Sequence, residues 1–154
     1  MKLSANFSVG ELTRSQTATR KGIDNSPNEE QLVNLQALCE NVLQPIRDYF
    51  GKPVRISSGL RVPELNSAIG GSTTSDHCKG MAADIEIPGV DNKELAEWIG
   101  ANLEFRQLIL EFYTSGNPES GWVHVSYNSD DNKQQVLTAT KQDGKTVYLP
   151  GLVA

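Results

Sequence analysis

Several features that would point to particular protein classes are missing from this chain. It has no run of about 20 apolar residues, which excludes a membrane-spanning helix. Lys and Arg number 14 against 19 Asp and Glu, giving a net charge of −5. This balance argues against nucleic acid as a partner, because phosphate binding needs a basic face. It also provides no attraction to anionic lipid or teichoic acid.

The chain also shows no secretion signal and has only two cysteines. Residues 1–6 contain one basic residue and no apolar stretch, so we expect cytoplasmic synthesis without a signal peptide. Of the two cysteines, Cys39 lies in an apolar run and is predicted to be a small buried hydrophobic residue rather than half of a disulfide. Cys78 is predicted not to bind metal, since neighbouring side chains of an extended segment point to opposite faces. Nothing here requires an oxidising compartment.

The length and composition are typical of one globular domain over residues 1–154. The chain is 38% hydrophobic and 21% charged, with no repeat, low-complexity segment or linker. Apolar residues at helical spacing predict a long helix over 27–50, with Ser26 as its N-cap and an interruption at Pro45. A second capped helix is expected to begin after Asp91.

Short apolar stretches predict the strands of a sheet. They cover residues 53–57, 83–87, 107–113 and 122–127, with a final hairpin around Asp143-Gly144. Residues 13–21 have no periodicity and are expected to form a solvated loop. Because the apolar helix faces need a sheet to pack against, we predict an α+β fold with a central antiparallel sheet covered by helices.

The two histidines and one aspartate are the residues that suggest chemistry. His77 and Asp84 are seven positions apart, and Asp84 lies near the start of a predicted strand; His124 lies in another strand. Two His and one Asp form a three-ligand set for a catalytic zinc, with the fourth position left to water. A lone histidine is more often a structural hydrogen-bonding residue, so the spacing alone is a weak indication.

A wider pattern surrounds these residues. Ser75-x-His77, Gly80, Ala82 and Asp84, followed by Trp122-x-His124, resemble the M15 zinc peptidases. These are D-alanyl-D-alanine carboxypeptidases and L-alanyl-D-glutamate endopeptidases that cut peptidoglycan stem peptides. The similarity covers nearly the whole chain, which looks like the short single-domain members common in phages and prophages. It implies Zn²⁺ bound by His77, Asp84 and His124, and a hedgehog/DD-peptidase-like α+β fold.

The resemblance also implies roles for residues that contact substrate. The arginine of the Ser58-Gly59-Leu60-Arg61 segment faces the active site in the family and binds substrate. A guanidinium group suits that role because its fork holds a carboxylate or a developing oxyanion. Ser75 either hydrogen-bonds substrate or orients His77, and a simple turn residue is an equally good interpretation.

The general base is predicted from the pairing of two strands. If they form an antiparallel hairpin with Tyr113 opposite Trp122, Glu111 falls opposite His124, with Cβ atoms ~5 Å apart. A charge inside an apolar strand needs a partner, and a metal site supplies one; a salt bridge to a lysine or arginine is the alternative. Glu111 is therefore our first choice for the base. A slip of one residue would remove this pairing.

The chain departs from the family pattern at two places. Many relatives carry an acidic residue three positions before the last zinc ligand, where this chain has Gly121. Glu119, five positions before His124 on the connecting loop, is therefore the second candidate for the base. Phage-type relatives tend to have Asp-Gln where this chain has Arg106-Gln107.

The predicted function is metal-assisted hydrolysis of peptidoglycan stem peptides by a monomer. Either the D-Ala-D-Ala or the L-Ala-D-Glu bond fits the sequence. We expect action on the cell wall or in the periplasm, as a phage or prophage lysis enzyme that reaches its substrate through lysis or a holin. The alternative is a non-catalytic, zinc-stabilised module that binds peptidoglycan or serves in phage structure.

Overall fold

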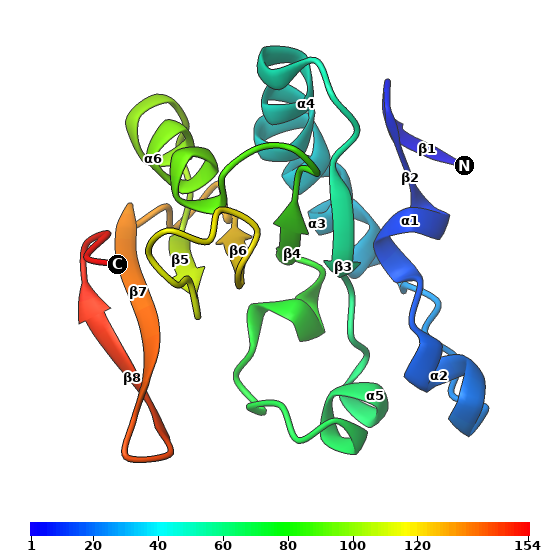
Figure 1. The fold of residues 1–154 in the computed structure, drawn as a ribbon. Helices are drawn as coiled ribbons and strands as arrows, with labels where there is room; N and C mark the ends of the chain where they lie inside the picture. The colour runs from blue at the N-terminus through cyan, green and yellow to red at the C-terminus, as the bar shows by residue number, and fades with distance from the viewer.

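The computed structural model describes residues 1–154 and combines two sheets with helices (Figure 1). A small sheet near the N-terminus consists of β1 (Lys2–Ser4) and β2 (Phe7–Ser8). The main sheet contains β3 (Arg55–Ser58), β4 (Ala82–Glu86), β5 (Gln107–Glu111), β6 (Trp122–Ser126), β7 (Gln135–Gln142) and β8 (Lys145–Pro150). The α-helices are α1 (Val9–Thr13), α2 (Gln16–Lys21), α3 (Glu29–Leu38), α4 (Gln44–Phe50), α5 (Pro63–Ala68) and α6 (Asn92–Asn102).

The main sheet has the strand order β3-β4-β6-β5-β7-β8, and the predicted α+β fold is confirmed. All neighbouring strands are antiparallel except β5 and β7, which are parallel. The expectation of a wholly antiparallel sheet was wrong at this pair. The chain passes from β6 around the start of β5, where Gln134 and Gln135 donate to the carbonyls of Phe105 and Arg106, and β7 then runs alongside β5 in the same direction.

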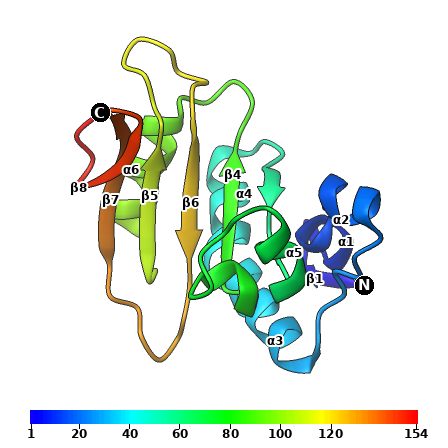
Figure 2. The same ribbon diagram turned by 90° about the horizontal axis from the view of Figure 1, so that it is seen from below.

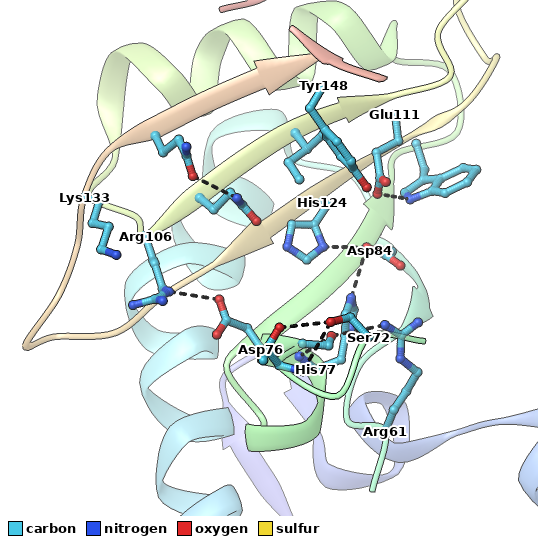
Figure 3. A pocket seen from close by; sticks show the side chains of 16 residues that line it. Arg61, Ser72, Asp76, His77, Asp84, Arg106, Glu111, His124, Lys133 and Tyr148 are labelled. Atoms are coloured by element: carbon cyan, nitrogen blue, oxygen red, sulfur yellow. Dashed lines mark hydrogen bonds and ion pairs between the residues drawn. The ribbon is translucent and has the colours of Figure 1, made fainter. Parts of the chain in front are cut away.

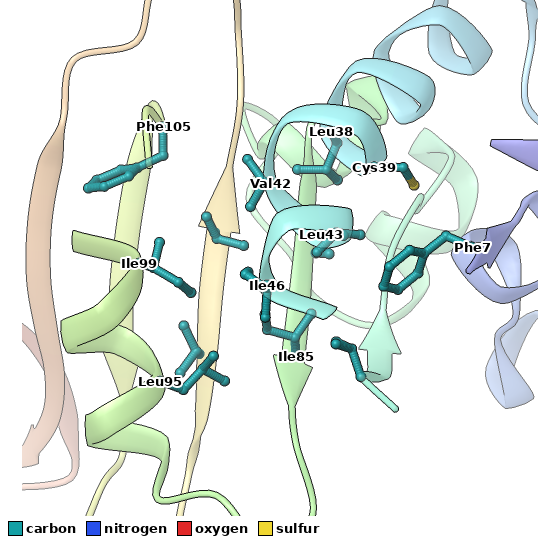
Figure 4. Packing of buried hydrophobic residues seen from close by; sticks show 14 of the residues in the cluster. Phe7, Leu38, Cys39, Val42, Leu43, Ile46, Ile85, Leu95, Ile99 and Phe105 are labelled. Atoms are coloured by element: carbon teal, nitrogen blue, oxygen red, sulfur yellow. The ribbon is translucent and has the colours of Figure 1, made fainter. Parts of the chain in front are cut away.

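The two faces of the sheet differ because side chains alternate along each strand. In β5 and β6, Leu108, Leu110, Val123 and Val125 are fully buried in the core, whereas His124 belongs to the opposite face. Helices α3, α4 and α6 cover the apolar face (Figures 2 and 4). The other face is free of these helices, so it is available for a polar site.

The long helix predicted over 27–50 forms as three consecutive segments. A π-helical turn, η1 (Cys39–Leu43), separates α3 from α4. Pro45 has no N–H to donate to the preceding turn, which accounts for the interruption there. The N-cap is Asn28, in a capping box with Gln31, so the predicted cap at Ser26 was wrong. Cys39 is buried and unpaired, as expected.

The segment predicted to be a solvated loop over 13–21 is largely helical. Ser15 caps α2 by accepting a hydrogen bond from the Ala18 N–H, and Gly22 ends it in the left-handed conformation. Both capping residues were visible in the sequence. The helix is only six residues long, so it shows no apolar periodicity from which to predict it.

Gly121 allows a close approach between the end of β5 and the start of β6. Its φ is +65°, and a Cβ at this position would lie 1.9 Å from the Glu111 carbonyl oxygen. Gly116, in the same connection, has a φ of +86° but open space around it. The position where relatives carry an acid therefore has no room for a side chain in this chain.

We predict that Gly121→Ala destabilises the protein more than Gly116→Ala. Both alanines incur the left-handed backbone strain of about 1–2 kcal/mol. Only Gly121→Ala adds a steric overlap, which we expect to lower the free energy of unfolding by about 1–3 kcal/mol more. Urea unfolding of the two variants measures the difference. Equal losses in both would show that the contact with Glu111 relaxes without cost.

Candidate metal centre

Three potential metal ligands converge on the open face of the sheet (Figure 3). Asp84 on β4 lies directly opposite His124 on the adjacent β6, so both side chains leave the sheet on the same side. His77 belongs to the short 3-10 helix η2 (Asp76–Lys79), which leads into β4. Their ligand atoms all lie within 4.8 Å of one another. Asp84 Oδ1 is 3.0 Å from His124 Nδ1 and 3.4 Å from His77 Nε2.

The His77 ring is held in one orientation by backbone groups. Its Nδ1 lies 2.7 Å from the Gly59 carbonyl oxygen, which leaves Nε2 facing Asp84. A Cβ on Gly59 would lie 2.3 Å from the Leu12 carbonyl oxygen, so only glycine allows this segment to approach α1. Ser75 caps η2 by accepting a hydrogen bond from the His77 N–H at 3.2 Å. His77 thus uses its second nitrogen for a hydrogen bond outside the ligand set.

The electrostatics of the three residues are strongly linked. Burial alone would raise the pKa of the Asp84 carboxyl, but the hydrogen bonds and positive charge of His124 and His77 hold it well below its usual range. Burial would lower the pKa of His124, but the hydrogen bond and charge of Asp84, with the charge of Glu111, raise it. A metal cation would take the place of the proton between His124 and Asp84.

The donor set fits a zinc ion. It offers two imidazole nitrogens and one carboxylate oxygen, which are ligand types that zinc accepts. The charged partners of Asp84 are the two histidines, and no lysine or arginine forms an ion pair with it. Cys78 is not part of the set. It lies on η2 rather than on the extended segment that we expected.

A polar pocket of about 490 Å³ opens over the three ligands. Its lining includes five other residues that the sequence patterns above already named: Arg61, Ser75, Arg106, Glu111 and Trp122. Glu119, the second candidate for the base, does not lie there. It is exposed and borders a separate pocket beside Glu86 and Asn92.

Glu111 reaches this pocket although its predicted register was wrong. It lies opposite Trp122, and Ile109 lies opposite His124. A shift of two residues preserves the face, because side chains alternate with a period of two. Trp122 Nε1 donates to Glu111 Oε2 at 2.7 Å. Burial and the charge of Asp84 raise the pKa of the Glu111 carboxyl, which suits a proton acceptor.

Arg61 contributes a cation without a carboxylate partner. Its one side-chain hydrogen bond runs from an Nη to Ser75 Oγ at 3.4 Å, and its Nε is buried without an acceptor. The backbone N–H of Arg61 donates to the His77 carbonyl oxygen, which fixes the segment beside η2. Guanidinium donors that face a pocket without protein acceptors can bind an anionic ligand.

Sequence reasoning gave no role to Arg106 and missed Lys133 and Tyr148 altogether. Arg106 forms an ion pair with Asp76 at 3.1 Å and another with Asp131, so it joins η2 to the connection before β7. Lys133 and Tyr148 complete the wall formed by the C-terminal part of the chain. The predicted hairpin around Asp143-Gly144 was correct, but nothing local in the sequence indicates which strand it joins.

Comparison with known families gives the class of the protein. The chain matches the family described as Peptidase M15 over residues 5–126. It therefore belongs to the peptidase M15 family. Among individually curated proteins, none matches the chain. The matched segment contains all three metal-ligand candidates, Arg61 and Glu111, whereas β7 and β8 lie beyond it. No helix in the structure has the length and apolar character needed to cross a membrane.

We predict that His77→Ala abolishes high-affinity zinc binding, because it removes one of three ligands. Cys78→Ser is the matched control, since it changes the adjacent side chain and should retain one zinc per chain. Elemental analysis after zinc loading and desalting measures both. Stoichiometric zinc in His77→Ala, or its loss in Cys78→Ser, would contradict this ligand set.

The metal-free protein should lose stability on both sides of a pH window. Asp84 has a lowered folded pKa, so its contribution is present above its unfolded value of about 3.9 and is lost toward acid pH. His124 has a raised folded pKa, so its contribution is present below about 6.5 and is lost as pH rises through the folded value. Thermal unfolding with chelator present measures this window.

Zinc should reverse the alkaline side of that profile, because bound imidazole must be neutral and affinity rises with pH. A metal-free melting temperature that stays constant from pH 6 to pH 9 would contradict the proposed coupling of His124 and Asp84.

Proposed function

We propose that this protein is a zinc peptidase that hydrolyses a peptide bond in peptidoglycan stem peptides. Membership of the M15 family supports a peptidase, and peptidases of this family are in general zinc-dependent. The observation that carries the proposal is the convergence of His77, Asp84, His124, Glu111 and Arg61 on one pocket. A site that served only to stabilise the fold would need neither a carboxylate nor a guanidinium group that lacks an oppositely charged partner.

A metal ion held there would supply Lewis-acid chemistry, polarising a carbonyl group and activating water. The Glu111 carboxylate accepts the proton of the attacking water and then passes it to the leaving amine. Its raised pKa favours this exchange, and the hydrogen bond from Trp122 fixes one oxygen while the other stays available.

Arg61 stabilises the negative charge that develops on the carbonyl oxygen, or holds a carboxylate of the substrate. Its buried, unpaired Nε supports this role, because a substrate oxygen would satisfy that donor. Ser75 orients the guanidinium group through its contact with an Nη and caps the helix that carries His77.

The pocket suits a polar peptide. Only three of its 16 lining residues are hydrophobic, which favours a substrate with carboxylate and amide groups over an apolar one. Stem peptides have this character. We propose the cell wall as the place of action and lysis by a phage or prophage as the setting, with either the D-Ala-D-Ala or the L-Ala-D-Glu bond as the target. The alternative is a zinc-stabilised module that binds peptidoglycan without cutting it.

Glu111→Gln should retain zinc and lose most of its activity. Removal of a general base lowers kcat by about 100-fold or more, while the amide keeps the shape of the side chain. Glu119→Gln is the matched control, since Glu119 lies outside the pocket, and it should keep wild-type kcat. Zinc content and kcat of both variants are measured together. Full activity in Glu111→Gln with a dead Glu119→Gln would move the base to Glu119.

The activity itself is tested with purified, zinc-loaded protein on muropeptides. Mass spectrometry of the products identifies the bond that is cut, and a chelator should stop the reaction until zinc is restored. A zinc-loaded protein that binds muropeptides but cuts none between mildly acid and mildly alkaline pH would establish the binding-module alternative instead.

A further inference from the structure

One row of residues crosses the sheet beside the metal centre and extends beyond the family-matched segment. Glu111 on β5 lies opposite Trp122 on β6 and level with Ala139 on β7. Ala139 in turn lies opposite Tyr148 on β8. Residues that face each other across strands share a side of the sheet, so the row ends in an aromatic side chain on the pocket face.

Ala139 determines how far Tyr148 reaches. Its side chain is a single methyl group and is buried, so the Tyr148 ring lies over β7 without obstruction. Figure 3 shows this ring extending toward the Glu111 carboxylate, with its hydroxyl directed into the pocket. The residue is nevertheless 52% exposed, so a ligand in the pocket can contact it.

The Tyr148 hydroxyl has no hydrogen-bond partner within the protein. Burial raises the pKa of this phenol, and the charge of Glu111 raises it further. A phenol is protonated at neutral pH, so the group is a free donor. Glu111 already accepts a hydrogen bond from Trp122. A phenol left unpaired beside this carboxylate is available to a substrate.

The position of Tyr148 identifies which half of a substrate it meets. Figure 3 shows Arg61 and Tyr148 on opposite sides of the His77–Asp84–His124 set. We take here the first of the two roles proposed for Arg61, in which it faces the carbonyl oxygen, while Glu111 delivers the proton to the leaving amine. The amine is therefore released on the Glu111 side, where Tyr148 stands. Both candidate bonds release a residue that carries a carboxyl group, D-Ala or D-Glu.

We propose that Tyr148 is a substrate-binding residue whose hydroxyl donates a hydrogen bond to a carbonyl or carboxyl oxygen of the residue on the leaving-group side. This inference rests on the proposed function and adds a specificity determinant to it. It assigns that role to the β7–β8 hairpin, which lies outside residues 5–126.

Tyr148→Phe tests the proposal, because it removes the hydroxyl and keeps the ring. We expect a KM about tenfold higher on the cleaved muropeptide, with kcat nearly unchanged, because one hydrogen bond that acts in ground and transition states alike is lost. Tyr49→Phe is the control: this tyrosine is exposed on α4, where its ring stacks on Trp98, and it lies outside the pocket.

Product inhibition provides a second measurement. The product released with the new amino group should inhibit Tyr148→Phe about tenfold more weakly than wild type. The other product, which keeps the acyl side of the cleaved bond, should inhibit both equally. Unchanged KM and unchanged inhibition would overturn the role of Tyr148 while the peptidase proposal stands. A fall in kcat at constant KM would also overturn it, because the hydroxyl would then act through Glu111. A zinc-loaded wild type that cuts no muropeptide would overturn both proposals together.

Discussion

The pairing of Asp84 with His124 across β4 and β6 is the constraint on which the rest of the site depends. A slip of one residue in either strand would turn its ligand into the core and bring an apolar neighbour, such as Ile85 or Val123, to the open face. The third ligand is fixed to this pair from the helical layer. Gln31 of α3 donates to the Cys78 carbonyl at 3.0 Å, which ties the 3-10 helix carrying His77 to the helix beneath it. The ligand set is thus held by both layers of the fold.

Much of the fold was predictable because the signals were local. Short apolar stretches identified β5 and β6, and Pro45 marked the interruption of the long helix. The predictions failed where the decisive contact is distant in sequence. The parallel pairing of β5 with β7 depends on a connection that passes around the start of β5, and no residue pattern within either strand encodes that choice. Similarly, α2 is too short to show a periodicity, and only its caps indicate it.

The candidate site was predictable to the same degree. His77 and Asp84 are close in sequence and follow a specific pattern, so their convergence could be anticipated. Glu111 was assigned to the correct face with the wrong partner, because Gly121 and the loop before it allow β6 to pair two residues further along. Tyr148 could not be found from sequence. Its place in the pocket requires two successive strand pairings, of which the sequence indicates only the hairpin between β7 and β8.

The parallel pairing also has a consequence for solubility. Without the β7–β8 hairpin, β5 would become the edge of the main sheet, and its Leu108-Ile109-Leu110 stretch would present unpaired backbone groups to other molecules. Edge strands with a continuous apolar stretch and no proline recruit further strands and aggregate. The hairpin therefore occupies the edge of β5 and prevents other chains from pairing with it. A fragment cut where the family similarity ends would retain every metal ligand and yet lack this protection.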